Sequence, residues 1–174
     1  MARVLPDDEI AGLLDEKKLL PRNWATRLAP KKMAGQAHLR RKVDVKGDGG
    51  NDFNIDVRLN SLDQLDFSII LSFIDNDGQR YIIRRYNGKH LSSHTNQWEK
   101  RHGRPKASFG PSFHIHTGTE RYQIEGLKID GYAEVTNEYA SFDSALRLFV
   151  NCNGFSVEGE DFPLLDQTEQ DKPE

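Results

Sequence analysis

Strict alternation of apolar and polar residues over positions 53–60 is the feature that most constrains how this chain folds. Every second residue is apolar and the residues between are polar, in the run Phe53-Asn54-Ile55-Asp56-Val57-Arg58-Leu59-Asn60. Successive side chains of a β-strand point to opposite faces, so this run predicts a strand with one buried face. One strand cannot bury that face alone, and the pattern therefore requires a sheet.

The flanking segments supply the neighbouring strands. Residues 39–45 alternate in the same way, whereas residues 66–75 carry apolar side chains on both faces, which is typical of a central strand. Asp77-Gly78 signals a tight hairpin, and residues 79–86 return as its second strand. Two further short strands are expected, over residues 113–117 and 132–136. Together these segments predict an antiparallel meander sheet of about five or six strands.

Helical signals lie at the two ends of the chain. Residues 7–20 begin with three acids and place apolar side chains at helical spacing, and a short second helix is expected from Asn23 to the residue before Pro30. Ser141 is the expected N-cap of a helix whose apolar stripe ends at Phe149. The fold class predicted is therefore α+β, with N- and C-terminal helices packed on one face of the sheet.

The 174 residues suit one domain. We expect a single α+β domain over residues 1–157, with an N-terminal helical section over residues 1–35 and an acidic, disordered tail over residues 158–174. Cys152 is the only cysteine, which excludes an intrachain disulfide framework and a thiolate zinc cluster. No apolar run approaches the roughly 20 residues that span a bilayer. A cytoplasmic protein without a membrane partner is the expectation.

The formal net charge of −3 conceals two basic stretches, over residues 22–46 and 80–106. Such stretches fit either a polyanionic partner such as RNA or an ordinary solvated surface balanced by the acidic tail. Within the second stretch, Arg84, Arg85, Tyr86 and Lys89 interleave cations with an aromatic ring, the combination that a nucleic-acid surface uses. We take these four as candidate nucleic-acid-binding residues, against the alternative of a solvated edge strand.

Histidines concentrate in one part of the chain. Five of the 6 histidines fall within residues 90–116, namely His90, His94, His102, His114 and His116. A strand that turns Phe113 and Ile115 inward points His114 and His116 together to the other side, roughly 6–7 Å apart. The pair could act as general acid and base on a phosphodiester, could bind a metal such as zinc with His90 and His94, or could simply form a polar outer face.

The segment after the second histidine adds two candidate catalytic residues. Arg121 could bind a phosphate through two parallel hydrogen bonds, and Tyr122 could donate a proton or support the histidines. The alternative is an ordinary surface turn with Tyr122 partly in the core. The residues between 87 and 110 show no periodicity, and a loop of that length is usually functional or disordered.

The segments 114–122 and 130–136 resemble an uncharacterised prokaryotic family of unknown function and, more distantly, the TumE-type toxin components of toxin–antitoxin pairs. The matching positions are Arg84 to His90, His114, His116 and the helix from Ser141 to Phe149, within residues 66–153. Residues 1–60 and the long loop before the histidine strand depart from that pattern. The resemblance implies action on RNA or an RNA-associated target, and an antitoxin-like protein as partner.

Three functional hypotheses follow. The first is a toxin-like, metal-independent ribonuclease without a cofactor, in which His114 and His116 are acid and base, Arg121 and Arg85 hold phosphate and Tyr122 gives support. The second is a metal-binding hydrolase that uses His90, His94, His114 and His116. The third is a non-enzymatic protein-interaction domain. The spatial arrangement of the four histidines discriminates among them.

Overall fold

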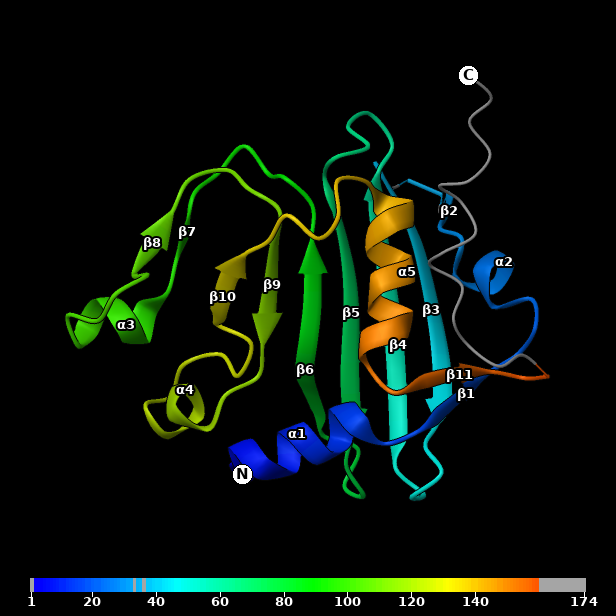
Figure 1. The fold of residues 1–174 in the computed structure, drawn as a ribbon, viewed down its shortest axis with the longest axis horizontal. Helices are drawn as coiled ribbons and strands as arrows, with labels where there is room; N and C mark the ends of the chain where they lie inside the picture. Colours follow the sequence, from blue (N-terminus) through cyan, green and yellow to red (C-terminus); the bar gives the residue numbers. More distant parts are fainter. Residues whose placement is uncertain (1, 33, 36, 160–174) are drawn as a thin grey trace.

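The computed structural model describes residues 2–32, 34–35 and 37–159, and its centre is an antiparallel sheet of seven strands in the order β10-β9-β6-β5-β4-β3-β2 (Figure 1). Its strands are β2 (Lys31–Lys32), β3 (His38–Lys46), β4 (Asp52–Asn60), β5 (Phe67–Ile74), β6 (Arg80–Asn87), β9 (His114–Thr117) and β10 (Tyr132–Val135). The predicted α+β class and meander are confirmed. The additional strand is β2, whose two exposed lysines give no alternation that a sequence reading could detect.

The core lies on one face of this sheet. Phe53, Ile55 and Val57 of β4 are buried there, beside the alternate residues of β5. Helix α5 (Phe142–Cys152) packs on this face through Phe149, whose ring contacts that of Tyr86 on β6. The cap predicted at Ser141 is present, because its side chain accepts a hydrogen bond from the Ser144 backbone N–H.

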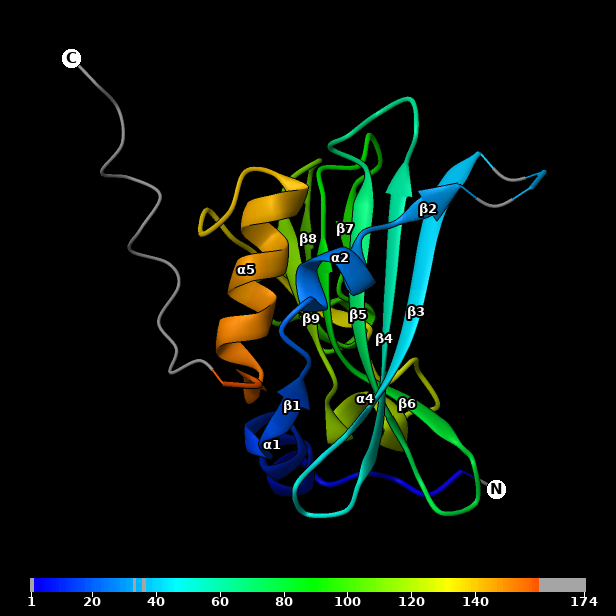
Figure 2. The same ribbon diagram turned by 90° about the vertical axis from the view of Figure 1, so that its right-hand side faces the viewer.

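The N-terminal segment covers the same face. Helix α1 (Asp7–Asp15) ends earlier than predicted, and the chain continues as β1 (Lys18–Leu20), which pairs in parallel with β11 (Phe155–Val157). Helix α2 (Trp24–Leu28) follows, close to its predicted position. Figure 2 shows α1, α2 and α5 on one side of strands β3–β5, so the opposite face, called the open face below, carries no helix over these strands.

The residues between β6 and β9 form a folded arm, defined as residues 88–113, at one end of the sheet (Figure 1). The arm contains β7 (His94–Thr95), α3 (Gln97–Arg101) and β8 (Ser108–Phe109), and β7 pairs with β8. Buried Asn96 attaches it to β10, since its side-chain amide accepts from the Ala133 N–H at 2.8 Å and donates to the Ala133 carbonyl at 2.9 Å. Helix α4 (Glu120–Ile124) connects β9 to the turn before β10.

No helix in the described part of the chain is long and apolar enough to cross a membrane. The predicted disordered tail lies outside the described residues, apart from its first two positions.

Candidate histidine metal centre

Three histidines from two separate segments meet on the open face at the edge of the arm. His114 and His116 lie on β9, alternate with partly buried Ile115, and are buried, whereas His94 approaches them from β7. One ring nitrogen of each histidine lies within 4.8 Å of a ring nitrogen of each of the other two. Coordination of zinc by three imidazoles at 2.0–2.1 Å requires nitrogens about 3.4 Å apart, so a modest contraction would complete the site.

These histidines line a pocket of about 430 Å³ between the sheet and the arm. Its wall also includes Arg85 and Asn87 of β6, His90 of the arm, and the turn from Lys128 to Gly131. The arm therefore supplies one ligand candidate and closes one side of the pocket. Sequence reasoning placed His114 and His116 together, but it could not place His94, because the course of the arm was unknown.

The hydrogen bonds of His114 and His116 fix which ring nitrogen carries the proton. Nδ1 of His114 lies 2.7 Å from the Ser112 carbonyl oxygen, and Nδ1 of His116 lies 2.8 Å from the Asp130 carbonyl oxygen. A carbonyl oxygen only accepts, so each Nδ1 bears the hydrogen and donates it. Each Nε2 is left with a bare lone pair. Imidazoles that bind metals are commonly held in this way through their other nitrogen.

His94 is oriented by the same principle through Asn96. Nε2 of His94 lies 2.9 Å from Oδ1 of Asn96 and 3.2 Å from the Gly131 carbonyl oxygen. Oδ1 of Asn96 already accepts from the backbone N–H of Ala133, so its identity as an oxygen is set by the chain. Nε2 of His94 is therefore the donor, and Nδ1 keeps the lone pair. Each of the three imidazoles thus offers one unprotonated nitrogen.

Asn87 is the residue that faces two of these lone pairs. Its Nδ2 lies 3.1 Å from Nε2 of His114 and 3.2 Å from Nε2 of His116, while its Oδ1 accepts from the Ser68 hydroxyl. An amide NH₂ has two hydrogens and can satisfy both lone pairs. Because the Ser68 hydroxyl can also accept, a turned amide would present Oδ1 to the same point. Asn87 is a functional residue that sequence reasoning missed, since one asparagine at a strand end carries no motif.

Electrostatics keep both strand histidines neutral. Burial lowers the pKa of His114 to about 4. Burial, reinforced by the positive charge of Arg85, lowers the pKa of His116 to about 2. At neutral pH both imidazoles are therefore unprotonated, which is the form that coordinates a metal. It is not the form that protonates a leaving oxygen.

His90 belongs to the pocket but not to the group of three ligands. Its ring centroid lies 5.7 Å from that of His114, and its Nδ1 lies 2.7 Å from Oδ1 of Asp66. The other oxygen of Asp66 accepts from the side chain of Asn60. Gly88 lets the chain reach this position, because a Cβ there would lie 1.9 Å from the Leu65 carbonyl oxygen. A carboxylate that holds Nδ1–H leaves Nε2 of His90 as a proton acceptor at the pocket wall.

The predicted pair Arg121 and Tyr122 lies in α4 and is turned toward Glu99 of the arm. The Tyr122 hydroxyl donates to Oε2 of Glu99 at 2.6 Å, and the Arg121 guanidinium pairs with Oε1 at 2.6 Å. Tyr122 is fully buried and contributes to the pocket wall, whereas Arg121 lies against Trp98 and Tyr132 outside it. In this arrangement both residues attach the arm to α4.

The four predicted nucleic-acid-binding residues are divided between two faces. Arg85 enters the histidine pocket and pairs with Asp130 at 2.5 Å. Arg84 lies on the other side, where it donates to the Thr117 hydroxyl, and Tyr86 is buried against α5. Lys89 is exposed at the start of the arm. Of the four, only Arg85 lies at the histidine centre, and Tyr86 presents no ring to solvent.

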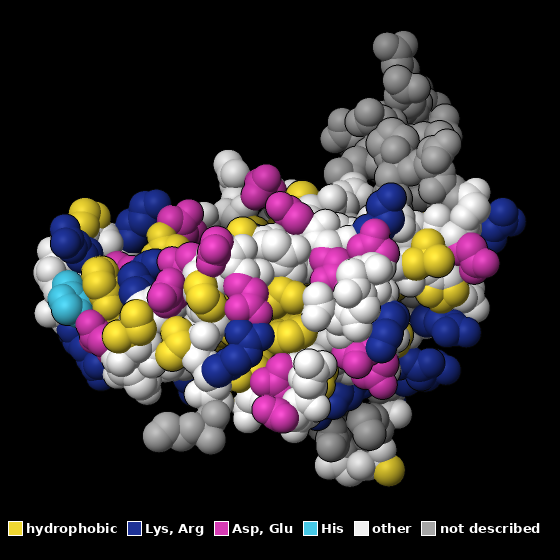
Figure 3. All heavy atoms as spheres, turned by 90° about the horizontal axis from the view of Figure 1, so that it is seen from below, with side chains coloured by type: hydrophobic (Ala, Val, Ile, Leu, Met, Phe, Trp, Pro, Cys, Tyr) yellow, Lys and Arg dark blue, Asp and Glu magenta, His cyan; other side chains and the backbone are white. Residues whose placement is uncertain are grey.

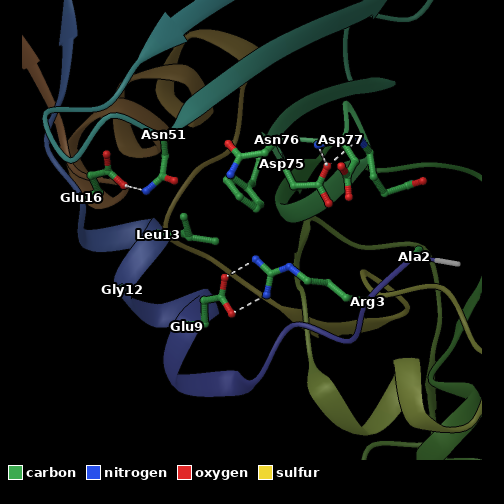
Figure 4. A pocket seen from close by; sticks show the side chains of 12 residues that line it. Ala2, Arg3, Glu9, Gly12, Leu13, Glu16, Asn51, Asp75, Asn76 and Asp77 are labelled. Carbon is green, nitrogen blue, oxygen red and sulfur yellow. Dashed lines mark hydrogen bonds and ion pairs between the residues drawn. The ribbon is translucent and has the colours of Figure 1, made fainter.

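A larger cavity of about 840 Å³ lies between α1 and the β5–β6 turn (Figure 4). Several of its charged groups already have partners, because Arg3 pairs with Glu9 and Glu16 accepts from Asn51. Figure 3 shows acidic and basic side chains interspersed over the face seen from below, on which α1 lies. We favour the smaller histidine pocket, since three histidines converge there within metal-ligand reach of one another.

No protein-family model, curated protein or solved structure matches this chain. The function is therefore argued from the geometry of the centre alone.

Proposed function

We propose that the protein is a metal-dependent hydrolase whose ion is held by His94, His114 and His116. The observation that supports this most is the common orientation of the three imidazoles. Each donates one N–H to an oxygen of the protein, and a ring nitrogen of each lies within 4.8 Å of one from each of the other two. Imidazole donors suit zinc and other late first-row metals, and three protein ligands leave a position for water or substrate.

A bound divalent ion supplies a Lewis acid and lowers the pKa of a water molecule in the pocket. The chain contributes the remaining groups. His90, with its Nδ1–H held by Asp66, is placed to take a proton at Nε2. Arg85 lies at the pocket wall, where its charge is paired with Asp130. Three neutral ligands would leave the charge of the ion uncompensated, which favours an anionic substrate.

The metal-independent ribonuclease mechanism stays a prediction with weaker support. It requires one histidine of the pair to be protonated near neutral pH, whereas the pKa of His114 is held at about 4 and that of His116 at about 2. Action on RNA and an antitoxin-like partner, which the TumE resemblance implies, likewise stay predictions. The interaction-domain hypothesis is disfavoured by the convergence of the histidines in a pocket.

The test is metal stoichiometry in protein purified without a histidine tag. We expect elemental analysis to find about one equivalent of a transition metal, or zinc titration of chelator-treated protein to show one tight site. His114→Gln should abolish the site, whereas His102→Gln should not, because His102 is exposed and pairs with Glu125 on the outside of the arm. Absence of a tight site in the unaltered protein, or equal losses in both variants, would contradict the proposal.

A further inference from the structure

The open face carries a straight polar row that begins at the histidine centre. Strand pairing places His114 opposite Asn87, Asn87 opposite Ser68, Ser68 opposite Arg58, and Arg58 opposite Arg40. Neighbouring strands lie roughly 4.8 Å apart, so the row crosses five strands over about 19 Å. One end of it is the candidate metal centre and the other end is a pair of arginines.

The arginine end has more positive charge than its own carboxylate can neutralise. Asp56 on β4 is fully buried, and Arg40 binds it through two hydrogen bonds of 3.0 and 2.7 Å. The guanidinium of Arg40 alone is therefore enough to neutralise the Asp56 carboxylate. Arg58, at 3.3 Å, and Arg80, at 3.9 Å, also approach Asp56, so three cations surround one anion.

These cations are accessible from solvent. The side chain of Arg58 is 44% exposed and that of Arg40 is 34% exposed. Lys42, exposed on β3, lies opposite Asp56 in the strand register and has no acidic partner within ion-pair distance among the described residues. Acidic residues also lie on this face, namely exposed Asp44 on β3, Asp52 paired with Lys46, and Asp66 beside Arg58. The excess of positive charge is therefore local to the end of the row around Arg58 and Lys42.

We propose that this face binds a single-stranded polynucleotide, with backbone phosphates on Arg58 and Lys42 and one phosphodiester in the histidine pocket. The catalytic part of this assignment rests on the proposed hydrolase function, but the binding part does not. Guanidinium groups bind phosphate through paired hydrogen bonds, and a cationic track follows a phosphate backbone. An extended polyanion can contact both ends of the row at once, which a mononucleotide cannot. A flexible single strand can enter a pocket whose histidines are buried, which a rigid duplex cannot.

The experiment is fluorescence anisotropy with labelled 12-nucleotide single-stranded RNA and DNA at several salt concentrations, using chelator-treated and zinc-loaded protein. We expect Arg58→Gln to weaken binding of RNA, DNA or both several-fold at low salt and to lower the salt slope by about one. Arg40 keeps Asp56 paired in this variant, and a thermal melt checks the fold. Lys42→Gln should act in the same direction. Arg27→Gln is the matched control, because Arg27 is exposed on α2, on the helix-covered side.

Equal affinities of Arg58→Gln and Arg27→Gln, or no binding by the unaltered protein at low salt, would overturn the proposal. The proposal would also be overturned if a poly-glutamate peptide bound as tightly as the polynucleotide and lost affinity equally in Arg58→Gln. The surface would then recognise acidic protein. Binding by the chelator-treated protein tests the surface without the metal. A failure of the hydrolase proposal would instead appear as absent metal with normal, Arg58-dependent binding.

Discussion

Lys18 and the histidine centre are both clusters of buried polar groups, but their hydrogen-bonding capacity is used differently. Lys18 is fully buried, and its Nζ, with three hydrogens, lies 2.8–3.2 Å from the carbonyl oxygens of Leu13, Leu14, Glu16 and Asn153. Those carbonyls lie at or near the C-terminal ends of α1 and α5, where helices leave acceptors without intrahelical partners. Burial lowers the pKa of Lys18 to about 8, and it stays protonated at neutral pH.

At the histidine centre, by contrast, each imidazole donates its N–H to a separate oxygen, whereas Nε2 of His114 and Nε2 of His116 share one partner, the Asn87 amide. A saturated buried cation supports the fold and binds nothing further. A set of convergent lone pairs is stabilised most by a cation that the chain itself does not provide.

The largest expected effect comes from removing a ligand. His116→Gln should reduce zinc affinity by more than about 100-fold, because a three-histidine site loses one of its bonds. Lys18→Met should leave zinc affinity unchanged. Competition with a chromophoric chelator measures both. Loss of zinc in the Lys18 variant at a temperature where it is folded would break the distinction between the two clusters.

The converse holds for stability. Lys18→Met should lower the free energy of unfolding of the metal-free protein by about 3 kcal/mol, because buried carbonyls lose a charged donor. Urea unfolding followed by circular dichroism measures the change. Lys17→Met is the control, since Lys17 is an exposed neighbour on the same segment. If the free energies of unfolding of the two variants differed by less than about 1 kcal/mol, the contacts of Lys18 with the carbonyls at the ends of α1 and α5 would not stabilise the fold.

The contrast also shows what the sequence could and could not predict. Alternation at residues 53–60 and the apolar stripe after Ser141 predicted the sheet and α5, because periodicity records which face is buried. The pair His114 and His116 followed from the period of a strand. The approach of His94, the Asp66–His90 pair and the role of Asn96 depend on the arm, whose path is set by long-range contacts. Lys18 was missed because a lysine near a helix end normally stays solvated.

Removing the side chain that orients His94 tests whether the arm contributes to metal binding. Asn96→Ala removes the acceptor that holds Nε2 of His94 and two side-chain bonds to the Ala133 backbone. We expect zinc affinity to fall by about 10–100-fold, the usual effect of losing a group that orients a ligand. Lys100→Ala, at an exposed position of α3 that does not line the pocket, should have little effect. Unchanged zinc affinity in a folded Asn96 variant would show that Asn96 does not orient His94.

Acid should destabilise the metal-free protein through the two strand histidines. The folded pKa values of about 4 for His114 and about 2 for His116 lie below the value of about 6.5 expected in the unfolded chain. The unfolded state therefore binds more protons below pH 6.5, and stability present above that pH is lost as the pH falls. The loss approaches about 1.4 kcal/mol per pH unit for each histidine. Urea midpoints of metal-free protein between pH 7 and 4.5 should show this slope, and it should be clearly smaller in His116→Gln.

The smallest predicted effect concerns Asn87, the one group that already faces two of the lone pairs. Asn87→Asp replaces a donor with a carboxylate, which no longer competes with a cation and adds a negative charge beside it. Zinc affinity should rise about tenfold, because neutral ligands leave the charge of the ion uncompensated. Asn76→Asp adds the same charge at the larger cavity near α1 and controls for net charge. If Asn87→Asp binds zinc no better than Asn76→Asp, the lone pairs of His114 and His116 are occupied by the Asn87 amide as part of the fold. The histidine cluster would then be saturated in the same sense as Lys18.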